Sequence, residues 1–134
     1  MRYEDETAQD RAFGDNIGFV VDLPHRRSFS PDAAHAYNVV IESDDFAEGA
    51  PDFAVEVRSK GDYGRAMDAE YAAKRADYFA AGTRIVWDVN PRKQTISSYM
   101  THDPNTPRVF KRGEIADAEP VLPGWRVSVD DLFR

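Results

Sequence analysis

The sequence contains no cysteine among its 134 residues. This excludes disulfide bonds, catalysis by a thiolate and zinc sites with cysteine ligands, and it fits the reducing cytoplasm, which is the location we expect. The chain also lacks an apolar run approaching the roughly 20 residues that cross a bilayer. Its acidic and polar start, MRYEDETAQD, differs from a signal peptide. We therefore expect neither secretion nor a membrane partner.

An excess of positive charge is missing as well. The chain has 17 Lys and Arg against 24 Asp and Glu, a formal net charge of −7. Proteins that hold nucleic acid by bulk electrostatics usually carry a basic excess, so the balance counts against a binder of that kind. It leaves open a binder whose carboxylates are neutralised by metal ions and whose basic side chains gather on one face. The basic candidates are Arg58, Lys60, Arg65, Lys74, Arg75 and Arg84.

The composition is typical of one folded domain. Hydrophobic residues make up 42% and charged residues 31% of the chain, as in ordinary soluble globular proteins. A chain of this length supports one hydrophobic core rather than two, so we treat residues 1–134 as a single domain. Residues 1–12 have no clear pattern, and we expect them to be a flexible arm or the remnant of a shortened N-terminal element.

Short strands are expected in the first half of the chain. The pattern predicts strands over 17–21 and 36–41, a loop over 25–31 and an acidic connector over 43–51. The clearest strand is 53–59, in which larger apolar residues at 53, 55 and 57 alternate with Ala54, Glu56 and Arg58. Glu56 is therefore expected on the face opposite the larger apolar side chains.

One long helix is predicted after this strand, over about 64–81. That segment is rich in alanine, has Met67, Tyr71 and Tyr78 at helical spacing, and is followed by Gly82, which suits a helix end. Further strands are expected over 83–89 and 94–100, joined as a hairpin, with weaker signals over 108–111 and 126–129 and a helical turn over 130–133. Strands, one long helix and more strands indicate an α+β fold.

Two carboxylates and a lysine are the residues most suggestive of chemistry. Asp32 lies just ahead of a predicted strand and Glu56 lies within the next one, so pairing of those strands brings the two acids together. Two carboxylates that lie close together repel each other, and such a pair normally requires a metal ion between them. Asp32 fits equally well as a turn residue after Pro31. Glu56 also fits as a solvated residue, but if the helix covers it, the carboxylate needs a partner.

Lys74 is a candidate for that partner. At about 100° per residue it lies within roughly 60° of the stripe formed by Met67, Tyr71 and Tyr78. The alternative is a lysine that packs its stem on the core and directs its ammonium into water. Arg58 and Lys60 are rivals, because both share the parity of Glu56 along the strand. The three histidines, His25, His35 and His102, form no spaced ligand pair and are interpreted as surface histidines.

Several motifs in a fixed order resemble those of a known family. They are Ser30-Pro31-Asp32, the run from Gly49 to Ser59 (GAPDFAVEVRS), Lys74 leading to Tyr78-Phe79-Ala80-Ala81-Gly82, Val86-Trp87-Asp88-Val89-Asn90-Pro91, Leu122-Pro123-Gly124-Trp125 and Leu132-Phe133. In these the chain is similar, over roughly residues 14–134, to the Uma-two family of restriction endonucleases in the PD-(D/E)XK nuclease superfamily. The ordered set is more specific than any single motif.

The resemblance implies a restriction-endonuclease-like mixed β-sheet flanked by helices. It implies that Asp32 and Glu56 are metal ligands and that Lys74 is the catalytic lysine, moved from the strand to the helix because Arg58 occupies the superfamily's lysine position. Relatives usually have an N-terminal helix and hairpin with a further acidic residue. None of Glu4, Asp5 and Glu6 is assigned that role.

Two functions from different classes follow. The first is a metal-dependent endonuclease that hydrolyses DNA phosphodiester bonds with Mg²⁺ or Mn²⁺ held by Asp32, Glu56 and the Val57 carbonyl. The second is a catalytically inactive nuclease-fold module that binds nucleic acid or a protein partner. DNA is the expected partner in the first case, and a homodimer remains open.

Overall fold

A mixed six-stranded sheet forms the centre of the computed structural model, which describes residues 11–13, 18–24, 26–29, 31–37, 40–41 and 46–133. The strands run in the order β1 (Arg11–Phe13), β4 (Ala33–Ala36), β7 (Phe53–Val57), β8 (Ile85–Asn90), β9 (Thr95–Met100) and β10 (Asp103–Phe110). Only β7 and β8 are parallel neighbours; the other pairs in this sheet are antiparallel. The parallel pair is possible because helix α1 (Arg65–Ala80) forms the crossover between the two strands.

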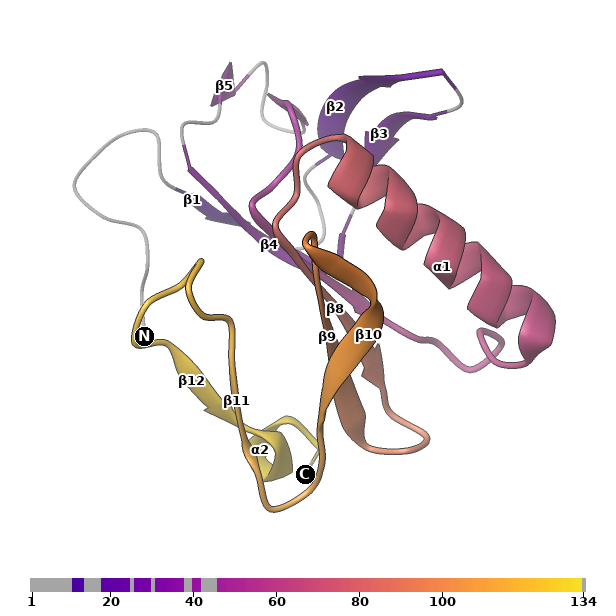
Figure 1. Ribbon diagram of the computed structural model, residues 1–134, viewed down its shortest axis with the longest axis vertical. Helices are drawn as coiled ribbons and strands as arrows, with labels where there is room; N and C mark the ends of the chain where they lie inside the picture. Colours follow the sequence, from indigo (N-terminus) through magenta and orange to yellow (C-terminus); the bar gives the residue numbers. More distant parts are fainter. Residues whose placement is uncertain are drawn as a thin grey trace.

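Two smaller sheets accompany the central one. The first contains β3 (Arg26–Phe29), β2 (Gly18–Leu23), β6 (Phe46–Glu48) and β5 (Val40–Ile41), and the second pairs β11 (Ile115–Asp117) with β12 (Arg126–Ser128), which leads into the short helix α2 (Val129–Leu132). Figure 1 shows α1 along one side of the central sheet and the β11, β12 and α2 segment on the other. The described helices include none that is long and apolar enough to span a membrane.

The two faces of the central sheet differ in chemistry. The face away from α1 is apolar: Phe53, Trp87 and Ile96 pack there with residues from the C-terminal segment, and the Trp87 ring lies 5.1 Å from Phe53 and 5.4 Å from Trp125, centroid to centroid. The face under α1 has a small apolar cluster around Ala54, Tyr78 and Val86. Beside that cluster it carries buried charged side chains, because strand alternation directs Glu56, Arg58 and Asp88 to this face.

Arg58 is the centre of an ion-pair network that joins β7, β8 and α1. Its guanidinium donates two hydrogen bonds to Asp88, from Nε to Oδ1 at 3.1 Å and from Nη2 to Oδ2 at 3.0 Å, and a third from Nη1 to Asp68 of α1 at 2.7 Å. Arg75 of α1 also approaches Asp88, at 3.5 Å. The hydrogen bond to Asp88 is the main reason that the pKa of Arg58 is raised, against the effect of burial, so the side chain stays charged.

Most elements of the second half of the chain were predicted correctly. The helix spans Arg65–Ala80, and Gly82 follows it at φ 111°, a backbone conformation that favours glycine. Strands β8 and β9 form the expected hairpin. Residues 103–110 form a longer strand than the weak signal at 108–111 suggested, and β11 was not predicted.

The first half departs more from the expectations. The predicted strand over 36–41 is wrong as one element, because β4 ends at Ala36 and Val40 and Ile41 belong to β5 in another sheet. The predicted loop over 25–31 contains β3, and the predicted connector over 43–51 contains β6. Of the segment 1–12, residues 1–10 lie outside the described residues, and Arg11 and Ala12 belong to β1, which pairs with β4.

The Arg58 network gives a stability prediction. Asp88→Ala leaves the buried Arg58 without its bidentate acceptor, and breaking a buried pair in this way is strongly destabilising. We expect the free energy of unfolding in urea to fall by about 3 kcal/mol. The control is Asp103→Ala, an exposed carboxylate at the start of β10, which should stay within about 0.5 kcal/mol of the parent protein. A loss of less than about 1 kcal/mol for Asp88→Ala would contradict this role.

Candidate active site

Glu56 lies near the end of β7, with its side chain beneath α1. The residue is only 7% exposed, and both carboxylate oxygens have partners from the helix. Oε1 accepts a hydrogen bond from Lys74 Nζ at 2.8 Å, and Oε2 accepts one from the Tyr78 hydroxyl at 2.6 Å. A carboxylate with this little solvent is stable only with such partners.

Lys74 and Tyr78 reach the same carboxylate because they are four residues apart on α1 and therefore lie on one side of the helix. The Lys74 side chain is 27% exposed, but its ammonium forms an ion pair with Glu56 at 2.8 Å. Of the two interpretations of Lys74, the structure thus places it at Glu56 rather than with its ammonium directed into water.

Tyr78 was named in the sequence only as part of the helical stripe and of a family motif, without a contact to Glu56. Burial strongly raises the pKa of its hydroxyl, and the negative charges of Glu56 and Asp32 raise it further. The hydroxyl therefore keeps its proton and acts as a donor to Glu56. The helical spacing of four from Lys74 was the signal in the sequence that could have identified this contact.

Asp32 directly precedes β4, as expected, and lies beside the end of β7. Ala33 pairs with Val55, and the Asp32 backbone N–H donates to the Val55 carbonyl at 2.9 Å. The Asp32 carboxylate accepts a hydrogen bond from the Val57 backbone N–H at 2.7 Å through Oδ2. Asp32 is exposed, whereas Glu56 is buried, so the pair has one solvent-facing and one enclosed carboxylate.

The oxygen donors here suit a hard divalent cation. Carboxylates from Asp32 and Glu56 and the backbone carbonyl of the 39% exposed Val57 belong to the ligand types that Mg²⁺ takes, and Mg²⁺ commonly uses one or two carboxylates while retaining several waters. Within the described ranges, no group of three or more His, Cys, Asp or Glu side chains is placed to hold an ion. Glu4, Asp5 and Glu6 lie outside the described residues.

The rivals of Lys74 take different places. Arg58 is enclosed by its network with Asp88 and Asp68 and does not approach the site as a free cation. Lys60 is exposed and forms no ion pair within the described part of the chain. Of the histidines, His102 is exposed as expected, and His25 is outside the described residues. The expectation of a surface histidine is wrong for His35, which is buried in β4 with its ring against Tyr37 at 4.7 Å.

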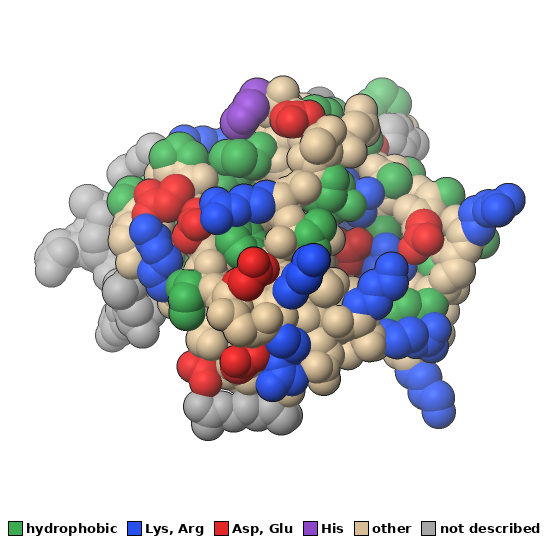
Figure 2. Space-filling model, turned by 60° about the horizontal axis from the view of Figure 1, so that its bottom comes forward, with side chains coloured by type: hydrophobic (Ala, Val, Ile, Leu, Met, Phe, Trp, Pro, Cys, Tyr) green, Lys and Arg blue, Asp and Glu red, His purple; other side chains and the backbone are tan. Residues whose placement is uncertain are grey.

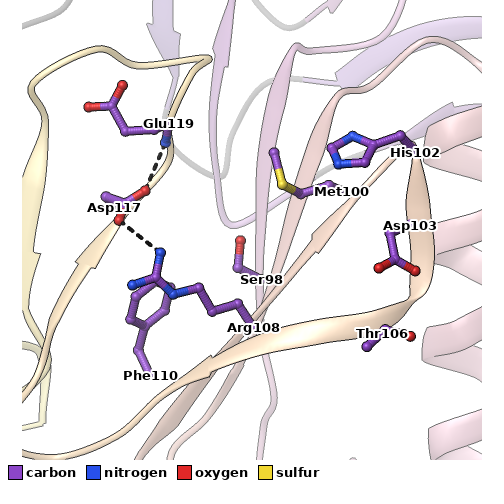
Figure 3. Close-up of a pocket in the computed structure, with 9 residues that line it drawn as sticks. All are labelled: Ser98, Met100, His102, Asp103, Thr106, Arg108, Phe110, Asp117 and Glu119. Carbon is purple, nitrogen blue, oxygen red and sulfur yellow. Dashed lines mark hydrogen bonds and ion pairs between the residues drawn. The ribbon is translucent and has the colours of Figure 1, made fainter.

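A separate hollow of about 140 Å³ lies beside β9 and β10. Figure 3 shows its His102 and Asp103 at the β9–β10 turn, apart from Asp117 and Glu119 on the other side. Asp117 approaches Arg108 at 3.5 Å, and the Glu119 carboxylate accepts hydrogen bonds from Gly124 N–H and Arg126. The acids of this hollow therefore do not converge on one point.

A solved structure shares this fold. The chain is similar to a crystal structure of a protein from Anabaena variabilis ATCC 29413 that is described as "a putative nuclease belonging to DUF820", with a TM-score of 0.69 and 20% sequence identity. The similarity covers 92% of this chain and 68% of that one. No curated protein matches the chain significantly.

A family model matches nearly the whole chain. The match extends over residues 2–130 and includes every element described above except the end of α2. The family is described as "Putative restriction endonuclease". The chain therefore belongs to the Uma2 family.

Proposed function

We propose that this protein is a metal-dependent endonuclease that hydrolyses DNA phosphodiester bonds at the end of β7. The observation that carries the proposal is the position of Asp32, which precedes β4 and is bonded to the Val57 N–H beside Glu56 of the neighbouring β7, with Lys74 bonded to Glu56 at 2.8 Å. Membership of a family described as restriction endonucleases supports the same reaction class.

Asp32, Glu56 and the Val57 carbonyl would hold Mg²⁺ or Mn²⁺. When bound, such an ion acts as a Lewis acid on the phosphate and lowers the pKa of a coordinated water. The overall reaction forms a bond between a water oxygen and phosphorus and breaks one ester P–O bond, whose oxygen leaves with a proton as a hydroxyl. Glu56 is shielded from water, so the effective dielectric constant around its carboxylate is low and its attraction to the Lys74 ammonium is strong.

Lys74 supplies the cation of the site. Its ammonium is fixed by the ion pair with Glu56, and a fixed positive charge stabilises the negative charge that builds up on the phosphate in the transition state. Tyr78 is a positioning residue in this proposal, because its hydroxyl holds the second oxygen of Glu56 and so orients the carboxylate toward the site.

Cleavage of plasmid DNA tests the ligand assignment. Purified protein with Mg²⁺ or Mn²⁺ should nick supercoiled plasmid, and a chelator should stop the reaction. Asp32→Ala and Glu56→Ala should each lower the nicking rate by more than about 100-fold, since each removes a proposed ligand. The matched control is Asp103→Ala, an exposed carboxylate far along the sheet, which should nick at the parent rate. Equal nicking by all variants would locate the activity elsewhere.

The role of Lys74 is tested against its rival Lys60. Lys74→Ala should reduce kcat by roughly 100-fold or more, because it removes a fixed charge from the transition state. Lys60→Ala, at an exposed position with no ion pair among the described residues, should leave kcat within about threefold, and any contribution of this charge to DNA binding should change KM instead. The opposite pattern, with kcat reduced only in the Lys60 variant, would assign the catalytic cation to Lys60.

The inactive nuclease-fold module remains the second candidate, favoured by the fact that Glu56 already has a partner on each oxygen. Titration calorimetry separates the two. The endonuclease proposal expects Mn²⁺ to bind at millimolar concentration or tighter, with binding abolished in Asp32→Ala. A folded protein that takes up no Mg²⁺ or Mn²⁺ in this range would favour the inactive module.

A further inference from the structure

The topology brings two exposed loops to the edge of the sheet where Glu56 lies. Strands β7 and β8 are parallel, with Glu56 opposite Asp88, so both end at this edge. The loop over 58–64 leaves β7 here, and the β8–β9 turn over 91–94 leaves β8 here. Arg92 lies in this turn, two residues beyond the end of β8.

Four exposed cations stand on these loops and on the first residue of α1, and we call them the basic edge: Lys60, Arg65, Arg92 and Lys93. In the described part of the chain none of the four forms an ion pair, although the protein has a net charge of −7. Their cationic groups are therefore available for an anionic partner.

The acids of the same region are engaged by other groups. Asp62 accepts hydrogen bonds from the Ser59 N–H at 2.8 Å and from the Tyr71 hydroxyl at 3.1 Å. Asp68 and Asp88 pair with Arg58. Arg58 and Arg75 offset the charge of Asp68 and Asp88. Asp62 is the one acid in the loop over 58–64 and the turn over 91–94, and the four cations of the basic edge outnumber it, so a local positive surface persists on an acidic protein.

Arg92 is held in place rather than free. Its guanidinium carbon lies 3.9 Å from the centroid of the Tyr63 ring, and its backbone N–H donates to the Tyr63 hydroxyl at 3.4 Å. These contacts tie the β8–β9 turn to the loop over 58–64. A cation that is already ordered loses less conformational freedom when it binds a partner.

A polar hollow of about 420 Å³ lies behind Lys93, between α1 and the β8–β9 hairpin. Asn90, Thr95 and Ser97 from the hairpin line it, and Arg75 lines it from the helix. Asp68 and Asp88 also line it, and both carboxylates are paired with Arg58, which lines it too. Hydroxyl, amide and cationic groups are the contacts that proteins use for phosphate and sugar oxygens. In Figure 2, Lys and Arg side chains gather on the half of this face toward the side where α1 lies in Figure 1.

We propose that the basic edge binds the sugar-phosphate backbone of duplex DNA beside the bond to be cleaved, with Arg92 and Lys93 as its main contacts. This inference rests on the proposed function, because Asp32 and Glu56 mark where the cleaved bond would lie and therefore which side of the site the DNA backbone would follow. Contacts of this kind act through charge, so the binding is independent of base sequence and weakens with salt.

Binding of a fluorescently labelled DNA duplex, measured by anisotropy over a series of salt concentrations in Ca²⁺ buffer, tests the proposal. The variant Arg92→Gln/Lys93→Gln should lower the slope of log affinity against log salt by about 1.8, or about 0.9 for each phosphate that is no longer neutralised. Its affinity should fall at least about fivefold at low salt, equally for unrelated duplex sequences. Arg92→Lys/Lys93→Arg, which keeps both charges, should retain the slope.

The control is Arg84→Gln. Arg84 is an exposed arginine just before β8, at the opposite end of the strand from Arg92, and its replacement should leave the slope unchanged. A double variant that binds DNA like the Arg84 variant would overturn the proposal, and so would a parent protein that binds no duplex or prefers double-stranded RNA. Binding that depends on Arg92 and Lys93 without any nicking would support the basic edge while contradicting the proposed endonuclease.

Discussion

The rest of the structure depends on the buried charge of Glu56. A carboxylate this far from water is costly unless its oxygens are bonded, and Lys74 and Tyr78 supply those bonds from α1. The same contacts fix the helix on the sheet and set the position of the lysine relative to Asp32. Together with the Arg58 network, these contacts hold α1 on the sheet, and a change in either residue of the Glu56–Lys74 pair affects both the helix position and the candidate site.

The sheet face beneath α1 carries buried charged side chains, and this explains why several charged residues of the helix face the sheet. On the opposite face, apolar side chains around Trp87 supply the hydrophobic stabilisation. Beneath α1, the apolar cluster is small, and Arg58, Asp88 and Glu56 make directional contacts with Asp68, Arg75, Lys74 and Tyr78. Directional contacts hold side chains in defined positions, which is the property that a catalytic site requires.

Much of the fold was predictable where local signals were strong. The alternation at Glu56, the alanine-rich helix with Gly82 and the β8–β9 hairpin are local patterns, and the structure confirms them. Strand β6 was missed because it pairs with β2, a distant part of the chain. Strand β3 is a local hairpin partner of β2 and was missed because its short sequence RRSF is mostly polar and has no clear strand pattern. The sequence did not reveal the hydrogen bond between Asp32 and the Val57 N–H or the ion pair between Arg58 and Asp88, because each joins residues at least 25 positions apart and forms only when the chain folds. Spacing left Lys74, Arg58 and Lys60 open, and only the packing of α1 on β7 separates them.

The central claim is that Asp32 and Glu56 share a divalent metal ion. The most direct measurement is an anomalous difference map from crystals of the protein soaked in Mn²⁺. The claim predicts one strong peak at about 2.1 Å from a carboxylate oxygen of each residue and from the Val57 carbonyl, a distance usual for ions of this type. A map with no peak there at millimolar Mn²⁺, or with the ion bound by other residues, would contradict it.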